Sequence, residues 1–537
     1  MPELKNVFEY HQFSKHGNNR SAPGPGYLDW ASQPNPFRRY QGTQIIQLEK
    51  VPPSERPFFS EALHPDQTSI APWNFTFLSQ LFFDCLALSA WKSFQGSQWA
   101  LRVNPSSGNL HPTEGYLISG PMEGLSTAPA VFHYCPSIHA LEVRAYLSME
   151  AWETMRAGFG QQTFFIGLSS IYWRESWKYG LRAFRYCQHD LGHALGAVNI
   201  ACAGLGWQAV LLDHLAGETL EVILGLTKKS ETEVEVPDCL IAISPKLDEA
   251  KPNKDTRQIL EAFNNDLQWM GTPNVLSQSH VEWSGIHEIS QATEKPPTDN
   301  LPSLPCSGET SLFEEDAFPL RKAIHQRRSA VAMDGRTRID RSTFLQFMIK
   351  ATPALCPLSF QTISWEPQVH LGLFIHRVDD LPQGLYFLLR NKKHLQELQS
   401  IFKSDFLWEK PQGCPETLDL FLLEEGDFRP LATSVSCGQQ IAGDGCFSLG
   451  MISAFRQPLE QHGPWFYRRL YWECGAIGQI LYLQAEVSGI RSTGIGCFLD
   501  DPVHQIFGIQ DMSYQSLYHF TVGGPIEDTR LTTMPPY

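Results

Sequence analysis

The sequence predicts an α+β fold that occurs twice along one chain. Two long amphipathic helices carry this prediction, one over Arg182–Gly206 and the other over Arg468–Gly489. In both, apolar residues recur at helical spacing and a glycine marks the end. Each helix leads to a segment that contains aspartate and then to a strand-like run. A stretch rich in Pro, Ser and Thr separates the two sets, as is typical of a linker.

The first copy is expected to follow an arm and to occupy residues 71–263. Residues 1–70 are rich in Pro, aromatic and polar residues, which indicates an extended N-terminal arm. A helix is predicted over Trp73–Trp91, because large apolar residues recur there at spacings of three and four. Strands are predicted at Tyr116–Ser119, Val131–Tyr134 and Asp238–Ser244.

The second copy is expected to occupy residues 317–537, after a linker over residues 264–316. Alternating apolar residues predict a strand over Val369–Ile375, and a final strand is predicted over Leu517–Val522. Two patterns also echo one another: Phe132-His133-Tyr134 followed by His139, and Leu385-Tyr386-Phe387 followed by His394. Internal repetition of this kind predicts two diverged copies of one domain.

Composition excludes several classes of protein. The chain has 537 residues and a net charge of −15, and no basic cluster appears, which argues against a nucleic-acid or anionic-membrane surface. No run approaches the roughly 18 apolar residues of a membrane helix. The polar N-terminus lacks a signal-peptide pattern. The 12 cysteines are scattered without a C-x-x-C pair and are read as reduced thiols. We therefore expect a cytoplasmic protein without a metal site.

A turn within Leu101–Leu117 is the first candidate for a binding site. Pro105 restricts the backbone on both sides of the Asn104-Pro105 bond, and Gly108 permits a turn that a Cβ would block. Hydroxyl and amide groups then share one tight turn, which suits the rim of a planar heterocycle such as a flavin. An ordinary surface turn has the same composition. The candidate ligands are Pro105, Ser106, Ser107 and Asn109.

Three stretches together resemble a known family. They are P-S-S-G-N-L-H-P-T-E-G-Y from Pro105, W-R-E-S-W-K-Y-G-L-R-A-F-R-Y-C-Q-H-D-L-G-H over Trp173–His193, and R-S-T-G-I-G-C-F-L-D-D from Arg491. They resemble the nitroreductase superfamily, and within it the azoline-dehydrogenase branch called SagB/McbC or thiazoline oxidase. The resemblance implies an α+β sandwich that normally binds FMN at a homodimer interface. Two such domains in one chain would form an intramolecular pseudodimer, as a monomer or as a further homodimer.

The resemblance further implies one composite FMN site. The first half would supply the loop from Pro105 to Asn109, and the second half basic and glycine-rich segments that hold the phosphate, since arginine binds phosphate oxygens bidentately. No P-S-x-x-N stands in Ala351–Trp365, so the second site is expected to have decayed, with Arg38-Arg39 as a residual candidate. The usual second arginine of R-x-S-x-R falls near Val331, a departure from the family. The second-half ligands are expected to be Arg327, Arg328, Ser329, Arg491, Gly494, Ile495, Gly496 and Arg530.

Lys178-Tyr179 stands where the azoline-dehydrogenase branch has its Lys-Tyr pair for proton transfer. Oxidation of an azoline ring moves a hydride to flavin N5 and removes a proton from the neighbouring carbon, which needs a base. A lysine can serve if burial and cations such as Arg174 or Arg182 lower its pKa. Gln461-His462 stands opposite in the second half. From the dipeptide alone, a surface lysine beside a packed tyrosine is an equally ordinary interpretation.

Three functions remain open from the sequence. The first is an FMN-dependent oxidoreductase that resembles azoline dehydrogenases and acts on a small molecule or a modified peptide. The second is an NAD(P)H-dependent nitro or quinone reductase, for which the Lys-Tyr pair would be dispensable. The third is a catalytically inactive peptide-binding scaffold. His189 and His193 have the spacing of half a metal site, but no pattern places a third ligand, so a packing role is favoured.

Overall fold

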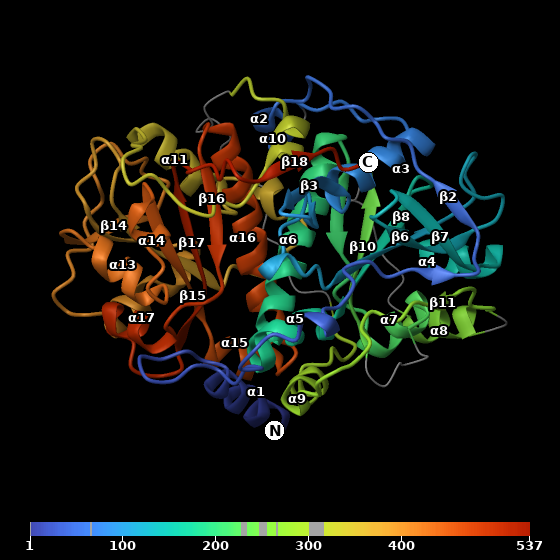
Figure 1. Cartoon of the computed structure of the whole chain (residues 1–537), viewed down its shortest axis with the longest axis horizontal. Coiled ribbons are helices and arrows are strands. Elements are labelled where there is room, and N and C mark those ends of the chain that lie inside the picture. The colour runs from blue at the N-terminus through green and yellow to red at the C-terminus, as the bar shows by residue number, and fades with distance from the viewer. Residues whose placement is uncertain (1, 65–66, 227–232, 246–254, 265–266, 300–315) are drawn as a thin grey trace.

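The computed structural model describes residues 2–537 apart from 65–66, 227–232, 246–254, 265–266 and 300–315. Two β-sheets lie on opposite sides of a central pair of long helices, α6 (Ala183–Gly204) and α16 (Phe466–Val487) (Figure 1). Across the described ranges, no helix combines the length and apolar character that a membrane span requires.

The two sheets have the same topology. The first has the strand order β2-β7-β6-β5-β8-β10-β9 and the second β14-β13-β12-β15-β17-β16, with every neighbouring pair antiparallel. When the added edge strand β2 is left out, β5 to β10 of the first sheet occupy the same positions, in the same chain order, as β12 to β17 of the second. The predicted tandem α+β fold is therefore confirmed. The bounds are β2 (Ile45–Gln47), β5 (Thr113–Ser119), β6 (Ala130–Cys135), β7 (Ala140–Tyr146), β8 (Phe164–Ile171), β9 (Gln208–Leu211), β10 (Glu235–Ser244), β12 (Val369–Ile375), β13 (Gly384–Leu388), β14 (Leu420–Glu425), β15 (Phe447–Ala454), β16 (Arg491–Ile495) and β17 (Tyr514–Gly523).

The helices repeat in the same order. In each half a helix precedes the sheet, a short helix leads into the long central helix, and another short helix precedes the last strand. The equivalent pairs are α3 (Phe75–Cys85) with α11 (Arg341–Lys350), α5 (Tyr172–Tyr179) with α15 (Arg456–His462), α6 with α16, and α7 (Gly217–Leu224) with α17 (Asp500–Phe507). The remaining helices are α1 (Pro2–Phe13), α2 (Phe59–Ala62), α4 (Met149–Arg156), α8 (Thr256–Asn264), α9 (Ser284–Ala292), α10 (Leu320–Gln326), α12 (Leu395–Ile401), α13 (Arg429–Val435) and α14 (Ile441–Asp444).

The central helices cross at a pair of glycines. Gly192 and Gly475 are each the tenth residue of their 22-residue helix, so the crossing point has the same place in both halves. A Cβ on Gly192 would lie 2.4 Å from the Trp472 carbonyl oxygen, and one on Gly475 would lie 2.3 Å from the His189 carbonyl oxygen. Glycine therefore allows the two backbones to touch. Both helices are buried on nearly all sides, since each lies between the partner helix and a sheet.

Buried ion pairs join the halves on both sides of this crossing. Asp500, at the start of α17, binds Arg182 at 3.0 Å and Arg185 at 2.7 Å in the first half. Conversely, an aspartate of the first half, Asp213, binds an arginine of the second half, Arg469 of α16, at 2.6 Å. The two aspartates follow equivalent strands, whereas their arginine partners differ in position, since Arg185 is the third residue of α6 and Arg469 the fourth of α16.

The N-terminal arm and the segment predicted as a linker carry regular elements. Strand β2 extends the first sheet, and β1 (Tyr40–Gln41) pairs with β11 (Thr272–Pro273). Helix α1 contacts α9, a helix within the predicted linker. Residues 300–315 of that predicted linker lie outside the described residues.

One local prediction was wrong. The helix predicted over Trp73–Trp91 ends at Cys85, and the chain continues into a sheet of β3 (Leu88–Phe94), β4 (Ser97–Arg102) and the C-terminal β18 (Thr532–Met534). Pairing with a strand from the far end of the chain overrides the helical periodicity that continues to Leu88. The echo between His139 and His394 does not extend to the next element, because His139 precedes β7 and His394 precedes α12.

Candidate functional site

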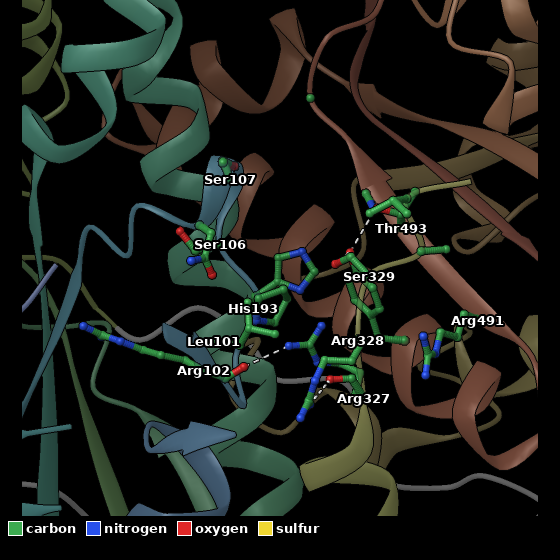
Figure 2. Close-up of a pocket in the computed structure, with 18 of the residues that line it drawn as sticks. Leu101, Arg102, Ser106, Ser107, His193, Arg327, Arg328, Ser329, Arg491 and Thr493 are labelled. Atoms are coloured by element: carbon green, nitrogen blue, oxygen red, sulfur yellow. Dashed lines mark hydrogen bonds between the residues drawn. The ribbon is translucent and has the colours of Figure 1, made fainter. Parts of the chain in front are cut away.

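A cavity of about 670 Å³ lies between the two halves, within the usual size range of cofactor sites. The first half lines it with the loop that begins at Pro105 and with side chains of α5 and α6. The second half contributes the segment after α10 and the strand β16. Figure 2 shows Ser106 and Ser107 on one side, with Arg327, Arg328, Ser329 and Arg491 on the other.

The loop turns tightly against the end of α5. Its backbone takes positive φ at Gly108, Asn109 and His111. A Cβ on Gly108 would lie 2.4 Å from the Tyr179 hydroxyl oxygen and 3.1 Å from Lys178 Nζ. Glycine at this position therefore brings the loop backbone onto the predicted Lys-Tyr pair.

Most polar groups of the loop hold its own shape. Asp190 of α6 accepts hydrogen bonds from the Ser107 backbone N–H at 3.0 Å and from the Ser107 hydroxyl at 3.0 Å. Asn109 Nδ2 donates to the Ala100 carbonyl at 2.7 Å, and the His111 N–H donates to Ser106 Oγ at 2.8 Å. The side chains of Ser107 and Asn109, predicted as ligands, thus fix the loop on α6 and β4.

Two buried carboxyl groups below the loop were missed by the sequence reasoning. Burial raises the pKa of Asp190 to about 7. Burial and the nearby Asp190 raise the pKa of Glu175 well above its usual range. Glu175 faces Asp190 and Ser106 of the loop. The pair therefore holds at least one proton at neutral pH. The available signal was an acidic residue between two tryptophans in W-R-E-S-W.

Lys178 and Tyr179 end helix α5 next to these carboxyls. Tyr179 lines the cavity, and Lys178 Nζ lies 5.2 Å from the centre of the Tyr179 ring. Burial, followed by the charge of Glu175, raises the pKa of Tyr179 well above its usual range, so its phenol is protonated at neutral pH. Arg174 and Arg182, expected to act on Lys178, instead form ion pairs with Glu114 and Asp500.

The opposite end of the cavity is cationic. Arg327 donates to the Arg102 carbonyl at 2.9 Å and to the Val103 carbonyl at 3.2 Å, and Arg328 donates to the Ser89 carbonyl at 3.0 Å. These bonds join the second half to β3, β4 and the chain that follows β4. Burial and Arg327 lower the pKa of Arg328 to about 10, which leaves it charged at neutral pH.

The glycine turn and Ser329 form one side of this end. The Tyr482 hydroxyl lies 2.8 Å from Ser329 Oγ and accepts from the Gly494 N–H at 2.9 Å. A Cβ on Gly494 would lie 1.8 Å from the Tyr518 hydroxyl oxygen, and one on Gly496 would lie 2.3 Å from a Tyr186 ring carbon. Glycine at both positions therefore allows Tyr518 and Tyr186 to pack directly against the backbone of the turn.

The remaining predicted cations differ in placement. Arg491 lines the cavity, forms an ion pair with Glu527 and lies 3.8 Å from Glu486. Arg530 is exposed, binds Asp528 at 2.8 Å and is not part of the lining. Lys92 of β3 also lines the cavity and was not predicted, since the helix predicted over Trp73–Trp91 ends just before it.

The two histidines of α6 attach this helix to β17. His189 Nε2 donates to the Leu517 carbonyl at 3.0 Å, and His193 Nε2 lies 3.2 Å from the Tyr518 hydroxyl. Burial lowers the pKa of both imidazoles, that of His193 to about 3, so both are neutral.

The equivalent position in the other half is occupied differently. Glu473, the eighth residue of α16 as Asp190 is of α6, accepts from the Gln368 and Val369 N–H groups at 3.0 and 3.2 Å. The buried Trp365 donates to the same carboxylate and takes the place of the serines. Arg38 lies near Glu233 and Glu235, and Arg39 binds Glu142. The residual clamp suggested for Arg38-Arg39 stays a prediction, and both arginines lie beside carboxylates of the first half.

Comparison with known proteins gives a match in fold. A protein of Anabaena variabilis ATCC 29413 named as a nitroreductase has a TM-score of 0.68 at 20% identity, over 97% of this chain and 99% of its own. Two shorter matches have a TM-score below 0.3. One is named as a nitroreductase of Ralstonia eutropha JMP134, with 17% identity over 41% of this chain and 96% of its own, and a TM-score of 0.28. The other lies in the E. coli microcin synthetase McbBCD complex with truncated pro-MccB17, with 16% identity over 45% of this chain and 92% of its own, and a TM-score of 0.27.

No protein-family model and no curated protein sequence matches the chain. The match that spans both halves nevertheless agrees with the strand order and the repeated central helices described above. The chain thus has the nitroreductase-like α+β fold, in two tandem copies.

Proposed function

We propose that this chain is an FMN-dependent oxidoreductase that oxidises a heterocycle such as a thiazoline or oxazoline, as a small molecule or within a modified peptide. The observation that carries the proposal is the convergence on one cavity of four segments. The first half supplies the loop from Pro105 and Tyr179, with Lys178 outside the lining but against Gly108 of that loop, and the second half supplies Arg327–Ser329 and the glycine turn after Arg491.

The chemistry of the lining fits a flavin mononucleotide. Arg327, Arg328 and Arg491 provide fixed positive charge at one end, where a phosphate of nearly two negative charges would be held. Asn104 lines the cavity, and its Oδ1 is buried without a hydrogen-bond partner in the described part of the chain. Unsatisfied buried polar atoms of this kind are expected where a ligand completes the hydrogen bonding.

The other end of the cavity provides proton chemistry. When bound, FMN would accept a hydride at N5. Lys178, held against Gly108, is the group that would take the proton from the adjacent substrate carbon. The protonated phenol of Tyr179 would orient the substrate by donating a hydrogen bond. Asp190, through Ser107, keeps the loop beside both groups.

The first test is flavin binding. The purified chain is expected to bind one equivalent of FMN, followed by the flavin absorbance spectrum and by flavin released on denaturation. Arg491→Ala is the sharper variant because Arg327 and Arg328 also bind backbone carbonyls of the other half. Loss of one charge-assisted contact at this half-exposed side chain predicts binding weakened by about 10-fold.

A matched arginine serves as the control for that test. Arg338→Ala removes an exposed arginine that binds Asp379 away from the cavity lining, and it is expected to leave FMN affinity unchanged. Failure of the unaltered chain to bind FMN would contradict the proposal and favour the catalytically inactive peptide-binding scaffold. Equal loss of affinity in both variants would contradict the assigned phosphate end.

The second test separates dehydrogenation from reduction. In an assay with a model thiazoline, Lys178→Ala and Tyr179→Phe are expected to lower kcat by about 10²- to 10⁴-fold with FMN content unchanged, because each removes a proton-handling group. The competing function, an NAD(P)H-dependent nitro or quinone reductase, is favoured by the name of the Anabaena protein. It predicts that NADH-driven quinone reduction survives both substitutions, and robust quinone turnover without thiazoline oxidation would overturn the first proposal.

A further inference from the structure

Two cysteines face each other at the edge of the cavity. Cys497 directly follows the glycine turn, lines the cavity and is exposed. Cys437 follows helix α13 of the same half, and its sulfur lies 2.8 Å from that of Cys497. Apart from these two and the half-buried Cys414, the described cysteines are buried. The contact thus brings together two thiols, one exposed and one half-buried.

The backbone holds the two segments in register. The Leu499 N–H donates to the Val435 carbonyl at 2.7 Å, and Gln439 Nε2 donates to the Cys497 carbonyl at 3.0 Å. Cys437 has a φ of +55°, a region that residues other than glycine rarely occupy. Since a covalent S–S bond is about 2.05 Å long, bond formation requires only a small approach of the two sulfurs.

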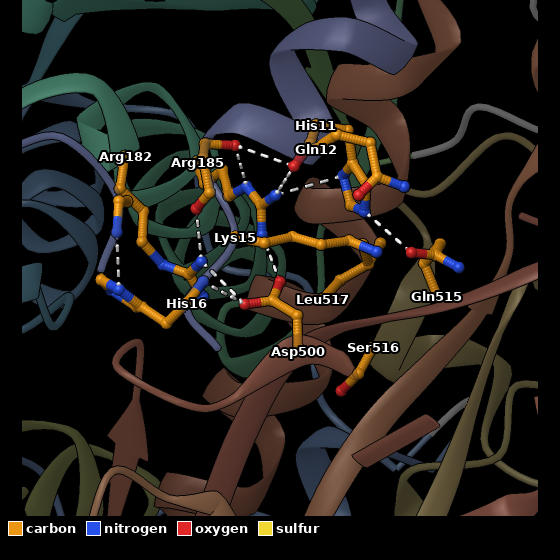
Figure 3. A network of polar contacts seen from close by, with 12 residues as sticks. His11, Gln12, Lys15, His16, Arg182, Arg185, Asp500, Gln515, Ser516 and Leu517 are labelled. Atoms are coloured by element: carbon orange, nitrogen blue, oxygen red, sulfur yellow. Dashed lines mark hydrogen bonds and ion pairs between the residues drawn. The ribbon is translucent and has the colours of Figure 1, made fainter. Parts of the chain in front are cut away.

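The surroundings favour a thiolate on Cys497. The adjacent Cys437 thiol, with smaller contributions from His16 and Arg182, lowers the pKa of Cys497 to about 5. His16 and Arg182 belong to the polar network around Asp500 (Figure 3). The same contact raises the pKa of Cys437. One thiol of the pair is therefore ready to attack while the other retains its proton.

We propose that Cys437 and Cys497 form a reversible dithiol–disulfide couple that is oxidised by low-molecular-weight disulfides and that links the glycine turn of the cavity to the end of α13. This proposal goes beyond the flavin chemistry and does not depend on it, because no step of the thiol exchange involves the cofactor.

The reaction proceeds by two exchanges. The Cys497 thiolate attacks one sulfur of the small disulfide, whose S–S bond breaks and releases one thiolate. Cys437 then loses its proton and attacks Cys497 Sγ, which breaks the mixed disulfide and releases the second thiolate. In sum, two protein thiols are oxidised to one disulfide, and one small disulfide is reduced to two thiols.

The test uses the full-length chain, reduced and then freed of reductant. Oxidised glutathione is added, remaining thiols are alkylated, and peptides are mapped by mass spectrometry. Cys437 and Cys497 are expected to lose alkylation together and to appear as one cross-linked peptide, while Cys414 stays alkylated. Full alkylation of both at excess oxidised glutathione would overturn the proposal. So would pairing of Cys497 with any other cysteine, including Cys306, which lies outside the described residues.

Single variants test the order of attack. Cys437→Ser is expected to accumulate a mixed disulfide between Cys497 and glutathione, because the second exchange is blocked. Cys497→Ser is expected to leave Cys437 free of glutathione, and the reverse pattern would contradict the assignment of the attacking thiol. Cys414→Ser, the matched control, is expected to retain the cross-link, and its loss there would count against a specific pair.

Discussion

Asp190 and Glu175 place two carboxyl groups beneath the loop from Pro105, and Asp190 accepts hydrogen bonds from the backbone and hydroxyl of Ser107 in that loop. A carboxyl group removed from water favours its protonated form, and two neighbouring carboxyls favour sharing a proton. The loop that carries the proposed ligands is therefore anchored by a residue whose charge changes near neutral pH.

This anchor predicts a pH-dependent stability. The pKa of Asp190 is about 7 in the folded state, whereas the usual pKa of an aspartate is 3.8. Folding thus retains a proton between these values, and the contribution to stability is lost as pH rises through this window. Melting temperatures measured from pH 5 to 8 are expected to fall less in Asp190→Asn than in the unaltered chain. The difference corresponds to a few kcal/mol or less, and parallel curves for the two proteins would refute the shifted titration.

For individual residues, the sequence predicted contiguous binding motifs better than contacts between residues far apart in the chain. Pro105–Asn109, Arg327–Ser329 and Gly494–Gly496 all line the cavity, because each is a short segment that forms its own turn. Glu175 and Lys92 escaped prediction, since their importance depends on segments far away in the chain. The exposed Arg530 was chosen by its position near the chain's end, which does not determine where its side chain points.

The crossing of α6 and α16 is the element on which the two halves meet. Their sequence periodicity predicted both helices to within two residues at each end, because long and strongly apolar stripes are dominated by local geometry. The sheet of β3, β4 and β18 could not be predicted in this way, since it combines strands from both ends of the chain.

A methyl group at the crossing is expected to destabilise the protein. Gly192→Ala would place a Cβ 2.4 Å from the Trp472 carbonyl oxygen and 2.8 Å from Gly475 Cα, so the helices must separate. Overpacking of this kind predicts a loss of about 1–3 kcal/mol or more in the free energy of unfolding, measured by chemical denaturation. Gly17→Ala, where no atom lies within 4 Å of the added Cβ, is the control expected to change little. Comparable loss in both would argue against a tight crossing.

Over the whole molecule, reciprocal ion pairs tie each half to the central helix of the other. Figure 3 shows Asp500 between Arg182 and Arg185, with residues of α1 and the turn after it alongside. The His16 N–H donates to Asp500 at 2.9 Å, and Arg185 donates to Ser14 Oγ at 2.8 Å. The N-terminal segment, predicted only as an extended arm, thus contacts the ion pairs of Asp500 that join the two halves. Sequence repetition revealed both aspartates but not their partners.

Removal of the Asp500 charge is expected to weaken the junction. Asp500→Asn leaves two buried arginines without their counter-charge, for which we expect a loss of about 3–5 kcal/mol in the free energy of unfolding. Arg182 and Arg185 hold the pKa of Asp500 at about 2, below the usual 3.8, so this contribution is present above about pH 4 and is lost as pH falls towards 2. Asp528→Asn, which removes the partner of the exposed Arg530, is the control expected to change stability little. An unaltered denaturation midpoint in Asp500→Asn would contradict the role assigned to this pair.

Fusion of the two copies has an evolutionary consequence at the helix position shared by Asp190 and Glu473. In a symmetric homodimer one codon specifies both copies of a residue, so every mutation is tested in two sites at once. Here two codons specify the two positions, and each has been free to change without its counterpart. Natural selection can therefore retain one copy for chemistry and convert the other, where Trp365 packs against Glu473, into a permanent structural support.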